Sequence, residues 1–199
     1  DMNQPLGCSV GNALDVAEAI TVLRGDDGGD LLEVSLALAA ELLVIAGVEA
    51  DLDSAKTAAR RALESGAGLE RLRRMIEQQH GDPRVVDDLS LLPHARRTVP
   101  VTADRGGTVS GVDAEAIGRA AQLLGAGRLE KDDPVDPAVG VEVGFRLGEE
   151  VSERDRLYVL HVNDESRLEE VRRLCLDAVE IGEREAPSHE LIRNRIDRP

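Results

Sequence analysis

The stretch DMNQPLGCSVGNALDVAEAITVLRG (residues 1–25) passes from a loop into a helix, and it decides how the rest of the chain is interpreted. Its first part is typical of a chain that leaves a buried strand through a Pro- and Gly-containing loop. Asn12 then provides a good N-cap for a helix over 13–24, with Asp15 three residues later in the capping-box position. Gly25 ends that helix. The chain is therefore expected to start in the middle of a fold.

Helical patterns continue to about residue 81, and no strand pattern accompanies them. The segment LLEVSLALAAELLVIAGV (31–48) is apolar almost all round, as expected for a helix buried among neighbours. Two later segments carry charged faces, with Asp51 or Asp53 as the N-cap of the first and an i, i+4 pair of Glu70 and Arg74 on the second. Helices are therefore expected at 31–47, 54–65 and 69–81. They form a helical layer whose sheet is missing, and in an α/β protein its strands would lie upstream.

The pattern changes after the Pro- and Asp-rich segment GDPRVVDDLSLLPHARR, which places a domain boundary around 82–97. Short, alternating or β-branched stretches follow, as is typical of strands. Strands are expected within TVPVTA (98–103), GTVSGV (107–112), AVGVEVGFRLGEEV (138–151) and DRLYVLHVND (155–164), and helices at 113–127 and 165–182. The expected fold class is thus α/β over residues 1–92, mainly helices, followed by a smaller α+β domain over residues 97–199.

Composition and charge disfavour several classes of function. The net charge of −15 and the pI near 4.7 argue against a nucleic-acid or anionic-membrane surface, because both need clustered Lys and Arg. Aromatic residues make up 1% of the chain, so stacking platforms for bases are nearly absent. The two cysteines form no C-x-x-C pair. The segment 31–48 is too short and too acidic to span a bilayer, so a cytoplasmic protein is expected.

Six segments, in order, resemble the C-terminal half of the pyrimidine-nucleoside phosphorylases, a family that includes thymidine phosphorylase. They are DMNQPLG, GNALDVAEAI, GDPRVVDD, DAEAIGRAAQLLGAGR, DPAVGV and HVNDE, within residues 1 to about 172. The resemblance implies that residues 1–92 complete a catalytic α/β domain and that residues 97–199 form a hammerhead-like C-terminal domain. It also implies a homodimeric pentosyltransferase of nucleoside salvage. In its reaction inorganic phosphate attacks the anomeric carbon of thymidine or uridine, releasing the base and a pentose 1-phosphate.

The resemblance further implies that the phosphate loop and the residues that hold the base belong to the N-terminal half. No Lys-containing, Gly-rich phosphate loop occurs in residues 1–199. We therefore expect no catalytic and no substrate-binding residue in this fragment, no organic cofactor, and no phosphorolysis by the fragment alone. Its expected partner is the missing N-terminal half of the same protein. Specificity for thymidine alone or for several pyrimidine nucleosides stays open.

One site carries over from the resemblance residue by residue. Family members bind a monovalent cation, potassium, through two main-chain carbonyls after the QPLG motif and a Glu on the following helix. The matching positions are Leu6, Ser9 and Glu18. Carbonyl and carboxylate oxygens are the ligands that hard cations prefer, and a Pro/Gly loop leaves carbonyls outside helical hydrogen bonding. Without the resemblance, Glu18 would be interpreted as a solvated helix residue.

Two other functions remain open at this point. The strand pattern after residue 106 also resembles biotinyl- and lipoyl-carrier domains, whose modified Lys stands in a hairpin. Lys131 is the only lysine nearby, and its flanking residues match neither carrier motif. A non-catalytic interaction module would fit the absence of catalytic motifs, but it would leave the apolar helix 31–47 exposed.

Overall fold

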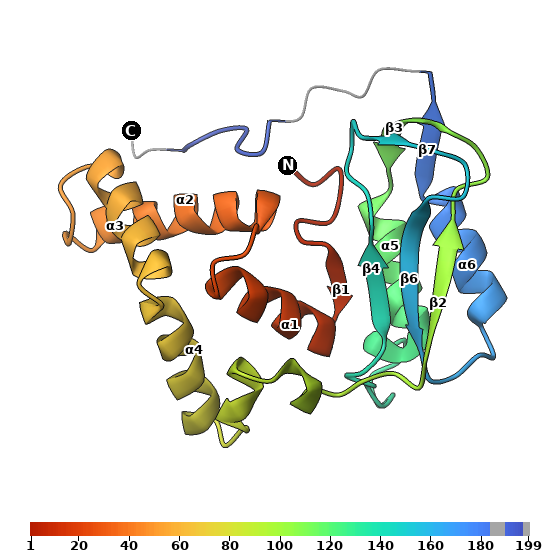
Figure 1. The fold of residues 1–199 in the computed structure, drawn as a ribbon, viewed down its shortest axis with the longest axis horizontal. Helices are drawn as coiled ribbons and strands as arrows, with labels where there is room; N and C mark the ends of the chain where they lie inside the picture. The colour runs from red at the N-terminus through yellow and green to blue at the C-terminus, as the bar shows by residue number, and fades with distance from the viewer. Residues whose placement is uncertain (184–189, 197–199) are drawn as a thin grey trace. The chain divides into compact units, whose positions relative to one another are not determined.

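The computed structural model describes residues 1–183 and 190–196 and divides the chain into two compact units (Figure 1). Residues 1–16 fold together with residues 93–199, and we call this part the mixed unit. Residues 17–92 form the second part, which we call the helical unit. The expected domains, 1–92 and 97–199, stay a prediction. As packing units, however, the first 16 residues belong with the C-terminal part.

The helical unit contains the helices expected from the sequence. They are α1 (Asn12–Leu23), which begins in the mixed unit, α2 (Gly29–Ile45), α3 (Leu52–Glu64) and α4 (Ala67–Gln78), followed by the 3-10 turns η1 (Pro83–Val86) and η2 (Leu89–Leu91). Gly25 ends α1 with a φ of 98°. Asp51, not Asp53, caps α3 by accepting a hydrogen bond from the Ser54 N–H at 2.9 Å. The Glu70–Arg74 pair forms at 3.2 Å.

The main buried cluster of the helical unit is small. Ile20 of α1 and Val85 and Val86 of η1 form it, with partly buried side chains of α4 and η2 around them. Arg24 donates to the Val86 carbonyl at 2.7 Å, which ties the end of α1 to η1. Arg73 and Asp87 add an ion pair of 2.7 Å. This unit therefore has much apolar surface outside its core.

The mixed unit is built of two antiparallel sheets with two helices, which confirms the α+β class expected for the C-terminal part. The first sheet has the strand order β1-β4-β6-β2 and the second the order β5-β3-β7. The strands are β1 (Ser9–Gly11), β2 (Arg97–Thr102), β3 (Gly107–Val112), β4 (Gly140–Val143), β5 (Glu150–Val151), β6 (Arg156–Val162) and β7 (Val179–Gly182). The helices are α5 (Ala114–Ala121), continued by the π-turn η3 (Gln122–Ala126), and α6 (Leu168–Asp177).

The core of the mixed unit lies where α5 and α6 pack together against the sheets (Figure 1). Alternating residues of β2, β4 and β6 point into it, because successive side chains of a strand lie on opposite faces. Tyr158 of β6 is fully buried there and meets Phe145 edge-to-face, with ring centroids 5.2 Å apart. The chain's single Tyr thus lies in the centre of this unit.

The last helix is shorter than the sequence pattern predicts, and the expected helix at 165–182 is wrong at both ends. α6 covers Leu168–Asp177, and residues 179–182 form β7, which pairs with β3. Val179 and Ile181 are β-branched and alternate, so they suit a strand once β3 offers an open edge. The N-cap is Arg167, a few residues after Asn163 and Asp164. Asp164 instead accepts from the Ser166 N–H at 2.8 Å in a turn before the helix.

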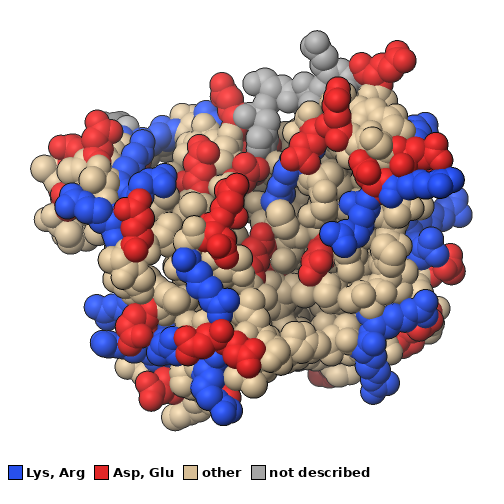
Figure 2. Space-filling view, viewed as in Figure 1, with Lys and Arg blue, Asp and Glu red and all other residues tan. Residues whose placement is uncertain are grey.

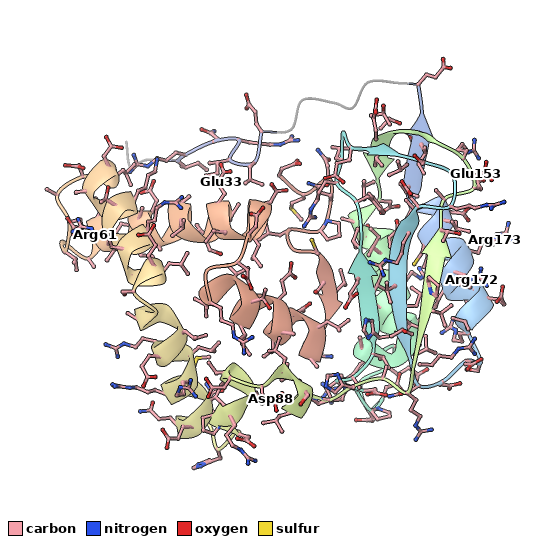
Figure 3. All side chains as sticks on the ribbon, in the orientation of Figure 1. Glu33, Arg61, Asp88, Glu153, Arg172 and Arg173 are labelled. Atoms are coloured by element: carbon pink, nitrogen blue, oxygen red, sulfur yellow. The ribbon has the colours of Figure 1, made fainter. Side chains whose placement is uncertain are left out.

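Acidic and basic side chains are interspersed over the face seen in Figure 2, in keeping with many short ion pairs at the surface. On α6, for example, Arg172 lies 3.4 Å from Glu169 and Arg173 lies 3.8 Å from Asp177 (Figure 3). Such exposed pairs contribute little to stability. No helix in the described part of the chain is long and apolar enough to cross a membrane.

Candidate functional site

The loop that carries Leu6, one of the expected cation ligands, is tightly held inside the mixed unit. We call residues 4–8 the N-terminal loop. Gln4 is its only buried polar side chain, and its Oε1 accepts a hydrogen bond from the Leu147 N–H at 2.8 Å. A buried amide needs such a partner, because an unsatisfied polar group inside a protein is costly. Gln4 therefore anchors the start of the loop to the segment between β4 and β5.

Arg146, in that same segment, holds the loop through its guanidinium group. Its Nη1 donates to the Pro5 carbonyl at 2.9 Å, and its Nη2 lies 3.0 Å from the Cys8 Sγ and 3.5 Å from the Leu6 carbonyl oxygen. The planar, permanently charged guanidinium can serve several acceptors at once. It fixes the direction of these carbonyls and places a positive charge beside Leu6.

The strand after the loop determines where the next carbonyl points. The Val143 N–H donates to the Cys8 carbonyl at 2.7 Å, and Ser9 lies opposite Glu142 in the β1–β4 ladder. Because successive carbonyls of a strand point in opposite directions, the Ser9 carbonyl is directed away from β4. β1 is the edge strand of its sheet, so this is the side on which no further strand pairs. A main-chain ligand at Ser9 is compatible with this geometry.

The start of α1 is fixed by bonds to two distant segments of the mixed unit. The Ala13 N–H donates to the Pro137 carbonyl at 3.0 Å, and Asn12 Nδ2 donates to the Ala126 carbonyl at 2.9 Å. The Asp15 carboxylate accepts from the Gly11 N–H at 3.0 Å. The capping box expected at Asn12 does not form, because the Asn12 side chain bonds to Ala126 and Asp15 accepts from the N–H of Gly11.

The structure brings two of the three expected cation ligands into one unit. Leu6 and Ser9 belong to the mixed unit, three residues apart, whereas Glu18 lies on the part of α1 that belongs to the helical unit. The complete three-ligand site stays a prediction. Within residues 1–183 and 190–196, no group of three His, Cys, Asp or Glu side chains is placed to hold a metal ion. The expected potassium site has two main-chain carbonyls and one carboxylate, so it differs from a site of three such side chains.

His161 on β6 contacts a carboxylate of the neighbouring strand β4. Its Nε2 lies 3.1 Å from Oε1 of Glu142 on the neighbouring strand, and this contact lowers the pKa of the Glu142 carboxyl below its usual value. The same Nε2 is buried, and the contact lacks the geometry of a hydrogen bond. Next to it, Asn163 donates to Asp136 at 2.7 Å and accepts from the Arg96 N–H. These groups connect β6 to two loops.

Lys131, the residue on which a carrier function would depend, is exposed in the loop between η3 and β4. A carrier lysine stands at a turn between two strands, and η3 is a helical turn. The structure therefore gives Lys131 no place in a β-hairpin.

Arg146 is the residue holding the N-terminal loop that the sequence patterns missed. It lies in a strand-like stretch with nothing in its immediate neighbours to distinguish it from the other arginines of the chain. Its role arises from pairing between residues about 140 positions apart, as in its bond to Pro5. A pattern of local periodicity contains no such information.

Comparison with known proteins shows which proteins this chain is similar to. Residues 108–182, which lie within the mixed unit, match the family model of the pyrimidine nucleoside phosphorylase C-terminal domain. The chain is 40% identical over 196 residues to a pyrimidine-nucleoside phosphorylase of Bacillus subtilis (strain 168). It is 38% identical over 174 residues to one of Staphylococcus aureus (strain N315).

These alignments confirm the resemblance to the C-terminal part of pyrimidine-nucleoside phosphorylases. They cover 98% and 87% of this chain but only 45% and 40% of the two relatives. The chain thus spans less than half the length of the curated relatives that it matches.

Proposed function

We propose that the chain is the C-terminal part of a pyrimidine-nucleoside phosphorylase. The complete enzyme would transfer the pentosyl group of thymidine or uridine to inorganic phosphate, releasing the base and a pentose 1-phosphate. The observation that carries this proposal is the 40% identity to the Bacillus subtilis enzyme over 98% of the chain. In this proposal the helical unit belongs to the catalytic α/β domain, and its sheet is supplied by the preceding part of the protein.

The chemistry of phosphorolysis indicates which part of the enzyme binds the substrates. Negative charge develops on the leaving base while the sugar becomes oxocarbenium-like, so catalysis needs cationic or hydrogen-bonding groups at the base and a positioned phosphate. The only lysines, Lys56 and Lys131, are both exposed, on α3 and in the loop before β4. We therefore assign binding of phosphate and base to the N-terminal part and a supporting role to this chain.

The supporting role centres on the N-terminal loop. In the proposal, the carbonyls of Leu6 and Ser9 and the carboxylate of Glu18 bind potassium beside the phosphate site. Arg146 and Gln4 hold the loop so that its carbonyls keep their direction. The enzyme is further proposed to be a cytoplasmic homodimer that uses no organic cofactor.

A chimera tests the proposed function. The region of the Bacillus subtilis enzyme that aligns with this chain is replaced by residues 1–199, and phosphate-dependent release of thymine or uracil is followed by absorbance. We expect the purified chimera to release the base only when phosphate is present. A folded chimera without activity, beside an active parent enzyme, would contradict the proposal.

A further inference from the structure

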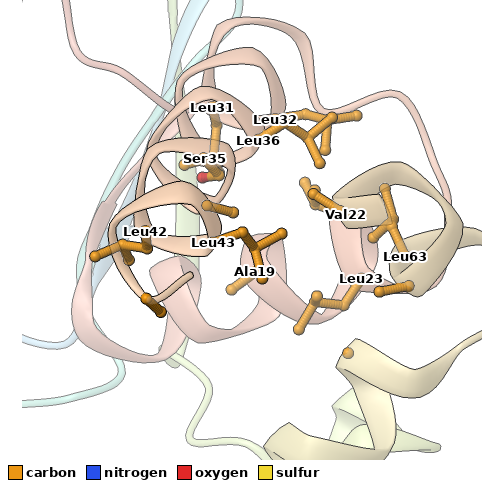
Figure 4. A pocket seen from close by; sticks show the side chains of 15 residues that line it. Ala19, Val22, Leu23, Leu31, Leu32, Ser35, Leu36, Leu42, Leu43 and Leu63 are labelled. Atoms are coloured by element: carbon orange, nitrogen blue, oxygen red, sulfur yellow. The ribbon is translucent and has the colours of Figure 1, made fainter. Parts of the chain in front are cut away.

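The helical unit contains an apolar groove that none of its own elements fills (Figure 4). Its volume is about 730 Å³, and α1, α2, α3 and the start of α4 line it. Ser35 is the only lining residue with a polar side chain. The larger apolar side chains are Val22, Leu23, Leu31, Leu32, Leu36, Leu42, Leu43 and Leu63.

The groove continues onto an exposed apolar stripe of α2. Leu38, Leu42 and Ile45 follow one another at i, i+4 and i+7, so they lie on one face of the helix. Their exposed fractions are 61%, 65% and 78%. Leu42 belongs to both the groove and the stripe, and the two features therefore form one apolar surface. A patch of this kind marks an interaction site.

The lining argues for a protein segment as the occupant. Small-molecule sites combine apolar walls with a few placed polar groups that orient the ligand, and a single serine hydroxyl does not supply them. Phosphate and nucleosides would find no charged partner in this groove. An apolar face of a strand or helix would fit it, because leucine-rich helices bury such faces in protein cores.

The length of the relatives indicates where that segment comes from. The Bacillus subtilis enzyme matches this chain over 45% of its own length, so more than half of the enzyme lies outside the alignment. We propose that the groove and the stripe on α2 are the surface on which an apolar segment of the N-terminal part of the phosphorylase docks. This inference rests on the proposed function and deepens it by naming the docking surface.

Binding between two separate polypeptides tests the inference. The chain is co-expressed with a tagged N-terminal portion of the Bacillus subtilis enzyme, namely the part that this chain does not match. The same portion with its own C-terminal part serves as the positive control. We expect residues 1–199 to co-purify with the tagged portion, and Leu42→Asp to weaken the binding at least tenfold, because a carboxylate would be buried in an apolar contact.

Met75→Asp is the matched control. Met75 lies on α4 outside the groove and is 49% exposed, so the substitution adds the same charge to the same unit. We expect it to bind like the unaltered chain. Circular dichroism is used to check that both variants fold, as we expect for substitutions at two exposed positions.

Three results would overturn the inference. They are equal binding by Leu42→Asp and the unaltered chain, no binding where the positive control binds, and a self-associated chain that Leu42→Asp converts to monomers. The last would show that a second copy occupies the groove. Failure of the proposed function looks different, since the chimera would then be inactive whether or not the two parts bind through this surface.

Discussion

Arg146 links the β4–β5 segment to the N-terminal loop, which lies about 140 residues earlier in the chain. Replacing it with Met removes the bonds to the Pro5 carbonyl and Cys8 while keeping the length of the side chain. Hydrogen bonds to charged groups contribute about 1.5–3 kcal/mol, so we expect a loss of about 1–2 kcal/mol in the free energy of unfolding. The fluorescence of Tyr158, the single Tyr in a chain without Trp, follows unfolding of the mixed unit in urea.

Arg173→Met is the control for this measurement. The Arg173 side chain is 86% exposed and makes only a 3.8 Å pair with Asp177, so its loss should change stability by less than about 0.5 kcal/mol. Equal effects of the two substitutions would contradict the role assigned to Arg146.

The two cysteines should differ sharply in reactivity. Cys8 is exposed, whereas Cys175 is fully buried, and burial raises the pKa of its thiol to about 12. Because the thiolate is the reactive form, an aromatic disulfide reagent at pH 8 should label one thiol per native chain. Cys8→Ser should abolish this labelling and Cys175→Ser should leave it. Rapid labelling of two thiols in the native chain would contradict the burial of Cys175.

The raised pKa of Cys175 also predicts that the free energy of unfolding depends on pH. The ordinary thiol value is 9.0, so the unfolded state loses this proton first, and the native state keeps it up to about pH 12. The stability contribution is therefore complete below about pH 9 and is lost as the pH rises through this window. In urea titrations between pH 8 and 11, Cys175→Ala should show a shallower fall in stability than the unaltered chain. Parallel curves would contradict the assignment.

Glu18 is the only expected cation ligand whose side chain can be tested by substitution. In the chimera, Glu18→Gln keeps the size of the side chain and removes its charge. We expect the potassium concentration for half-maximal phosphorolysis to rise about tenfold or more, because hard cations favour carboxylate oxygen. Glu33→Gln, on the exposed side of α2, is the matched control. An unchanged potassium dependence in Glu18→Gln would remove Glu18 from the site.

At the scale of elements, the pairing of β1 with β4 depends on two facing glycines, Gly11 and Gly140. A Cβ at Gly140 would lie 2.5 Å from the Val10 carbonyl oxygen, a distance that only a shift of the backbone can relieve. Gly140→Ala should therefore destabilise the mixed unit by about 1–3 kcal/mol, as overpacking does. It should also make the N-terminal loop more susceptible to proteolysis.

Gly118→Ala provides the comparison. Gly118 lies in α5, and a Cβ there would meet no atom within 4 Å. Because Ala is a better helix former than Gly, we expect a gain of up to about 1 kcal/mol. A Gly140→Ala variant as stable as the unaltered chain would contradict the importance of the close approach of β1 and β4.

The elements were predictable where local chemistry decides them. The apolar periodicity and the glycines that end helices located α1 to α4. At α5, Asp113 is the N-cap and accepts a hydrogen bond from the Ala116 N–H. The pattern failed at residues 179–182, because their strand conformation depends on pairing with β3, about 70 residues earlier. It failed likewise to show that β1 completes the sheet of the C-terminal part. Long-range pairing settles both cases.

The same contrast applies to the candidate site. The ligand positions Leu6, Ser9 and Glu18 could be named from a motif resemblance alone, and they stay a prediction. The hydrogen bonds that hold the loop could not be predicted. Arg146 and Gln4 make them with segments about 140 residues away. Sequence motifs locate the loop, and only the fold shows what holds it.

At the scale of the whole molecule, the two units differ in how completely they bury their apolar residues. The mixed unit has a continuous core that includes both of the chain's aromatic residues, Phe145 and Tyr158. The helical unit has a small buried cluster, made of Ile20, Val85 and Val86, and an open apolar groove. This asymmetry is what a helical layer without its sheet should show, and it agrees with relatives more than twice as long as the aligned region.

Phosphorolysis measured side by side for residues 1–199 alone and for the chimera with the Bacillus subtilis N-terminal part tests the central claim most directly. The account predicts no phosphate-dependent release of thymine or uracil from the chain alone and clear release from the chimera. Thymidine cleavage by the rigorously purified chain, or a folded chimera that releases no base, would contradict it.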